Sequence, residues 1–162
     1  MRHILLALLI AAPASAQNAD AVWQSLMDGN RAFVAGKVTF DHLADLRKHS
    51  ADHQNPPVTI LSCSDSRVPP ELIFNRSLDQ LFVIRVAGNV AADFETASIE
   101  YAIANGYTNL IVVLAPQFSW PRASAEYLLA KSKVIREAVG SKRVGLVVAY
   151  YHLDSGAVER LR

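Results

Sequence analysis

Apolar runs that alternate with helix-like segments constrain the fold of this chain more than any other feature. Strands are expected where short runs are rich in aliphatic residues, at 58–61, 80–86, 109–114, 144–151 and 157–161. Helical segments are expected where apolar residues recur at helical spacing or a turn signal opens a helix, at 18–35, 42–49, 71–74, 95–104 and 123–139. The run 109–114 is almost wholly apolar, which is typical of a parallel strand buried on both faces. The alternation predicts an α/β fold with a mainly parallel central sheet flanked by helices and a short C-terminal edge strand.

The first sixteen residues have the pattern of a secretory signal peptide. Arg2 and His3 form a basic start, 4–12 is an apolar core, and Ala14-Ser15-Ala16 is a small-residue cleavage site. The apolar run is too short for a stable transmembrane helix, and the alternative is a buried N-terminal helix. We expect 1–16 to be a signal peptide, 17–162 to be a single domain, and the protein to be exported to the periplasm or secreted.

The net charge and the cysteine content limit the partners and the kinds of site that this chain can have. The chain has 16 Lys and Arg against 15 Asp and Glu, and loss of Arg2 would bring the net charge to zero. No basic footprint for nucleic acid remains, and no membrane association is expected after signal cleavage. Cys63 is the single cysteine, so an internal disulfide is excluded. Metal ligation, thiol reactivity and an inert buried thiol stay open for Cys63.

The densest group of reactive side chains directly follows the first predicted strand. Cys63, Asp65 and Arg67 lie within five residues, in Cys63-Ser64-Asp65-Ser66-Arg67-Val68-Pro69-Pro70-Glu71. The ends of strands are where α/β proteins usually bind ligands, and a guanidinium can pair with a carboxylate through two parallel hydrogen bonds. Arg85 and Glu100 are expected to be buried polar supports nearby, without a catalytic role. The sequence therefore predicts the functional site at the end of the first strand.

This stretch resembles the first metal-binding motif of the β-class carbonic anhydrases. Further segments are similar to the family in the same order, at 27–37, 54–56, 82–89, 98–102 and 151–158. The resemblance implies the family's α/β fold, zinc as cofactor, reversible hydration of carbon dioxide to bicarbonate, and a homodimer or higher homo-oligomer. It also implies that Cys63 is a zinc ligand and that Asp65 is a second ligand in a closed state. In the same family Asp65 and Arg67 would form the catalytic dyad, and Gln54 would bind substrate.

The second half of the family's zinc site is missing from this chain. The family carries Gly-His-x-x-Cys-Gly after the third strand, and alignment on 112–114 places Pro116 at the His position and Ser119 at the Cys position. Proline has no ligating side chain, and a neutral hydroxyl is a poor substitute for a thiolate. The histidines that follow the signal segment have no spacing typical of a zinc site: His42, His49, His53 and His152.

These observations favour a β-carbonic anhydrase homologue with a partial zinc site, Cys63 and Asp65, and weak or no hydratase activity. The divergence and shortening after Leu114 also fit a decaying gene product, although the family-like ending argues against a simple frameshift. Two further alternatives stay open. One is an active zinc carbonic anhydrase, a lyase, with a rearranged ligand set. The other is a non-catalytic protein that binds bicarbonate or another small anion through Arg67 and Gln54.

Overall fold

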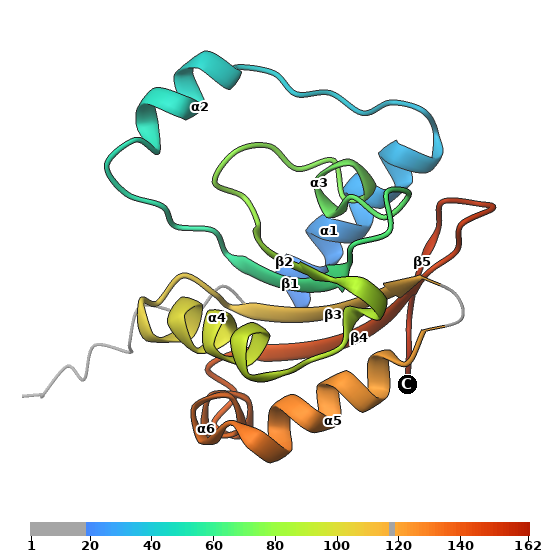
Figure 1. Cartoon of the computed structure of the whole chain (residues 1–162). Helices are drawn as coiled ribbons and strands as arrows, with labels where there is room; N and C mark the ends of the chain where they lie inside the picture. Colours follow the sequence, from blue (N-terminus) through green and yellow to red (C-terminus); the bar gives the residue numbers. More distant parts are fainter. Residues whose placement is uncertain (1–18, 117–118) are drawn as a thin grey trace, which may run out of the picture.

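The structure is a computed structural model that describes residues 19–116 and 119–162. It contains a five-stranded sheet with helices on both faces (Figure 1). The strands are β1 (Val58–Cys63), β2 (Phe82–Val86), β3 (Leu110–Pro116), β4 (Gly145–Tyr151) and β5 (Val158–Arg160). The helices are α1 (Ala19–Val34), α2 (Leu43–His49), α3 (Pro70–Ile73), α4 (Asp93–Ala104), α5 (Pro121–Lys131) and α6 (Lys133–Gly140), with the 3-10 turn η1 (Ala87–Asn89) after β2. The expected signal peptide, 1–16, lies outside the described residues and stays a prediction.

The sheet has the strand order β2-β1-β3-β4-β5. The first four strands in this order are parallel to one another, and β5 pairs antiparallel with β4 at the edge. All seven residues of β3 are buried, because β1 and β4 flank it and helices cover both faces. The predicted α/β class, the mainly parallel sheet and the C-terminal edge strand are confirmed.

Two hydrophobic clusters pack against the sheet, one on each face. Side chains alternate along a strand, so Leu110, Val112 and Leu114 of β3 pack in one cluster while Ile111 and Val113 pack in the other. The first cluster joins the sheet to α1 and α3, and the second joins it to α4, α5 and α6. In Figure 1 these two sets of helices lie above and below the sheet.

Helix α2 stands apart from this core. None of its residues is buried, and it interrupts the long connection between α1 and β1 (Figure 1). Its bounds agree with the helical turn expected at 42–49. Among the described helices, none is both long enough and apolar enough to cross a membrane.

The single helix expected at 123–139 is wrong, because Ser132 divides it into α5 and α6. Ser132 has an extended backbone (φ −98°, ψ 117°), and its hydroxyl accepts a hydrogen bond from the Ile135 N–H at 3.0 Å. The same hydroxyl donates to Glu100 Oε1 on α4 at 2.6 Å. A serine side chain that caps a new helix and binds a neighbouring one competes with continuous helical hydrogen bonding. Glu100 thus supports this corner rather than the site after β1.

One buried amide on α1 fastens the first helical layer to the sheet. Asn30 donates through Nδ2 to the carbonyls of Ile73 (3.2 Å) and Gly156 (2.9 Å), and its Oδ1 accepts from the Val158 N–H at 3.0 Å. Its neighbour Gly29 lies so close to α3 that an added Cβ would be 1.8 Å from the Phe74 carbonyl oxygen. These contacts hold α3, which directly follows the loop that ends at Arg67.

Candidate functional site

The candidate site lies where β1 ends, close to the middle of the sheet. Cys63 is the last residue of β1, two residues beyond the end predicted from sequence, and it pairs with Val86 at the end of β2. The neighbouring pair Ser62 and Leu114 puts the end of β3 beside it on the other side. Because β1, β2 and β3 are parallel, their carboxyl ends share one edge, the usual position of ligand sites in α/β sheets.

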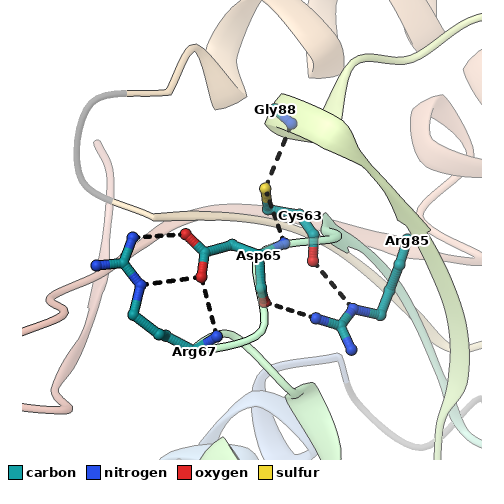
Figure 2. Close-up of polar contacts among 5 residues, drawn as sticks. All are labelled: Cys63, Asp65, Arg67, Arg85 and Gly88. Atoms are coloured by element: carbon teal, nitrogen blue, oxygen red, sulfur yellow. Dashed lines mark hydrogen bonds and ion pairs between the residues drawn. The ribbon is translucent and has the colours of Figure 1, made fainter.

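The Cys63 thiol is buried and receives two backbone hydrogen bonds. Its Sγ accepts from the Asp65 N–H at 3.4 Å and from the Gly88 N–H at 3.3 Å (Figure 2). Gly88 has a left-handed backbone (φ 68°), a conformation that costs glycine little and other residues more. The hydrogen bond from the Gly88 N–H ties the loop after β1 to the turn after β2.

Asp65 and Arg67 form a paired dyad on the same loop. Arg67 Nε donates to Asp65 Oδ1 at 3.0 Å, Arg67 Nη2 donates to Oδ2 at 2.7 Å, and the Arg67 N–H donates to Oδ1 at 2.9 Å (Figure 2). The Asp65 side chain is 22% exposed, whereas that of Arg67 is 66% exposed. Both carboxylate oxygens are therefore engaged by Arg67, which leaves the guanidinium as the part of the pair that faces solvent.

Pairing with Arg67 changes the pKa of the Asp65 carboxyl. Hydrogen bonds from the Arg67 side chain, then from its backbone N–H, lower the pKa of Asp65 from 3.8 to about 2. Since the folded pKa is below the unfolded one, the pair stabilises the fold fully above pH about 4, and this contribution is lost as the pH falls towards 2. We expect an NMR titration midpoint near 2 for Asp65, and a midpoint near its ordinary value in Arg67→Ala.

A matched control for this titration is Arg47→Ala on the exposed helix α2, which should leave the Asp65 midpoint unchanged. A midpoint near the ordinary value of 3.8 in the unmodified protein would contradict the pairing.

Arg85 of β2 holds the backbone of the same loop. Its Nε donates to the Cys63 carbonyl at 3.0 Å and its Nη2 donates to the Asp65 carbonyl at 2.7 Å (Figure 2). The predicted supporting role is confirmed, but the predicted burial is wrong, because the residue is exposed at the strand end. The signal in the sequence was a single cation inside an apolar strand, and its contacts depend on the pairing of β2 with β1.

Pro116 and Ser119, which the alignment places at the missing ligand positions, lie at the end of β3 and in the turn that follows. Pro116 is the last residue of β3 and is buried, two residues beyond the Leu114 that pairs with Ser62. Ser119 follows in a turn in which its N–H donates to the Pro116 carbonyl at 3.1 Å. The Ser119 carbonyl accepts a hydrogen bond from the Tyr150 hydroxyl at 3.4 Å. Neither side chain supplies the imidazole or thiolate of the family motif.

Gln54 lies away from the dyad within one chain. It precedes β1, next to Asn55, whose N–H donates to Asp79 Oδ1 at 2.7 Å before β2 begins. Cys63 lies at the other end of β1, roughly 17 Å further along an extended strand of this length. A single chain therefore does not bring Gln54 together with Asp65 and Arg67, and its substrate-binding role stays a prediction.

The histidines in the described part of the chain do not gather at the dyad. His49 ends α2 and His53 lies beyond the helix, with its ring 5.8 Å from that of Tyr107, so these two do not share a helical face. His152 follows β4 and lies 3.1 Å from Glu159 Oε2 at the edge of the sheet.

The donors at this site do not fit a catalytic zinc ion. Such a site needs about three protein ligands and an open position for water. Across residues 19–116 and 119–162, no three or more His, Cys, Asp or Glu side chains are grouped so that they would hold a metal ion. The loop after β1 offers Cys63 and Asp65, and the Asp65 carboxylate is already paired with Arg67.

Known carbonic anhydrases are similar to this chain in sequence. A family model described as carbonic anhydrase matches residues 58–116, which run from β1 to the end of β3. Carbonic anhydrase 2 of Mycobacterium tuberculosis is 42% identical over 102 residues, which cover 60% of this chain and 47% of that protein. The chain thus spans about half the length of the mycobacterial carbonic anhydrases that it matches.

Solved structures share the fold at lower identity. The β-carbonic anhydrase CafA of Aspergillus fumigatus has a TM-score of 0.64 at 18% identity, over 86% of this chain and 90% of that chain. One of two tetrameric β-carbonic anhydrases from Sordaria macrospora has a TM-score of 0.60 at 18% identity, over 87% of this chain and 97% of that chain. The family model, the sequence relatives and the shared fold together support membership of the β-class carbonic anhydrase family.

Proposed function

We propose that this protein is a member of the family whose own chain does not sustain zinc-dependent hydration of carbon dioxide. The observation that carries the proposal is the donor set after β1 and β3: one thiol and one carboxylate, with Pro116 and Ser119 in place of two ligands. Hydration by this route requires a metal ion that lowers the pKa of a bound water to roughly 7. Two donors from one loop hold such an ion weakly.

The geometry of the loop agrees with a role that needs no metal. The Cys63 thiol and the Asp65 carboxylate, the two candidate ligands, both already have hydrogen-bond partners in the chain. Arg67 pairs with the Asp65 carboxylate, and Arg85 donates to the Asp65 backbone carbonyl at the same edge of the sheet. The dyad therefore keeps its structure through Arg67 alone, and it leaves a solvent-facing guanidinium suited to a small anion such as bicarbonate.

Metal content and stopped-flow carbon dioxide hydration test this proposal together. After purification with zinc present and dialysis, we expect zinc well below one equivalent per chain and no hydration above the uncatalysed rate. Cys63→Ser is the matched variant, and it should change neither result. One equivalent of zinc with rapid hydration, both lost in Cys63→Ser, would overturn the proposal and establish a replacement ligand.

We further propose that the protein is exported and forms a homo-oligomer. Export is supported by the signal-like pattern of 1–16, and oligomerisation by the tetrameric relatives from Sordaria macrospora. Mass spectrometry of the exported chain and light scattering of the purified protein check the two proposals separately.

A further inference from the structure

A cavity lies away from the Cys63 edge, near the beginning of β1. It has a volume of about 330 Å³ and is open to solvent on one side, and α1, the start of β1 and the connection from α3 to β2 line it. Its apolar wall includes Val22 and Leu26 of α1 together with Pro57 and Val58. The volume is at the lower end of the range of about 300–1,000 Å³ that is typical of small-molecule pockets.

One cation, Arg76, lines this mostly apolar cavity. Arg76 Nη2 donates to Ser25 Oγ at 2.5 Å, and no ion pair joins Arg76 to a carboxylate in the part of the chain that the structure describes. Burial lowers the pKa of Arg76 from its ordinary value. A partly desolvated cation without an anion costs free energy, so this wall is complementary to a negatively charged group.

A second polar group lies in the same wall. Gln80 Oε1 accepts a hydrogen bond from the Ser77 N–H at 2.9 Å. Within the described residues its amide N–H groups have no hydrogen-bond acceptor, so they are free to donate to a ligand oxygen. The cavity thus combines a guanidinium and an amide donor with an apolar surface.

We propose that this cavity binds a small monocarboxylate with an apolar body. The carboxylate would pair with Arg76 and accept a hydrogen bond from Gln80, while the hydrocarbon part lies against Val22, Leu26 and Val58. A guanidinium suits the two oxygens of a carboxylate, and the apolar wall contributes through burial of hydrocarbon. A small inorganic anion would leave that wall uncovered, and a neutral apolar molecule would leave Arg76 without an anion.

Isothermal titration calorimetry of the full-length protein with benzoate tests the site. We expect saturable binding of benzoate, with binding at least about tenfold weaker for benzyl alcohol and for acetate, which lack the charge and the ring respectively. Arg76→Gln should weaken benzoate binding by about tenfold or more. Ala21→Phe, on the exposed face of α1 that lines the cavity, should block it while leaving Arg76 in place.

Two control variants separate this site from other cations. Arg47→Gln on α2 and Arg67→Ala in the dyad should both leave benzoate binding unchanged. Loss of binding in Arg67→Ala would assign the ligand to the dyad loop and overturn the proposal. The proposal also fails if benzoate does not bind, or if Arg76→Gln and Ala21→Phe are folded and bind benzoate as tightly as the unmodified protein.

Discussion

Replacing Asn30 by alanine is expected to lower the free energy of unfolding by about 3 kcal/mol or more. The substitution removes the partner of three buried backbone groups at once: the carbonyls of Ile73 and Gly156 and the N–H of Val158. Each buried polar group left without a partner costs about 1–3 kcal/mol. Urea denaturation followed by circular dichroism measures the change.

Asn105→Ala is the matched control for this experiment. Asn105 also donates through Nδ2 to a backbone carbonyl, that of Tyr101 at 2.9 Å, but at an exposed helix end. Water replaces such a partner, so the expected change is within about 0.5 kcal/mol. Equal effects of the two substitutions would show that Asn30 does not hold α1, α3 and β5 together.

Replacing Gly29 by alanine is expected to destabilise the protein by about 1–3 kcal/mol or more, although alanine is the better helix former. The added Cβ would lie 1.8 Å from the Phe74 carbonyl oxygen, which is backbone and cannot turn aside as a flexible side chain does. Either α1 or the end of α3 has to move, and both are fastened through Asn30. The same urea denaturation experiment measures the decrease in the free energy of unfolding.

Gly140→Ala is the matched control, and its expected change in the free energy of unfolding has the opposite sign. Gly140 ends α6, and a Cβ built there meets no atom within 4 Å. Without a clash, alanine reduces the conformational freedom of the unfolded chain and should stabilise the protein by about 0.4–1 kcal/mol. If both substitutions shift stability in the same direction, the close approach of α1 to α3 is not what restricts position 29.

Much of the fold was predictable because its signals are local. The runs that form β1, β3 and β4 are apolar enough to indicate burial, and turn residues mark their limits. The break at Ser132 was not predictable, because the helical spacing of apolar residues continues from α5 into α6. Its cause is a hydrogen bond to Glu100, 32 residues away in the sequence.

The sequence contains a signal for the structural role of Asn30 that none of the predictions above includes. It lies seven residues after Trp23 and four after Leu26, on the buried face of α1, where a polar amide needs partners. The sequence indicates that partners must exist but not which they are. Its most distant partner, Val158, is 128 residues away.

The sequence by itself indicated the family, most of the strands and helices, and the absence of an imidazole and a thiolate at Pro116 and Ser119, because these follow from residue identity and local pattern. It also predicted the pairing of Asp65 with Arg67, two residues apart. Only the tertiary structure decided that the Gly88 N–H meets the Cys63 sulfur and that Arg85 holds the loop. These relations depend on strand order and register, which arise from packing the whole sheet.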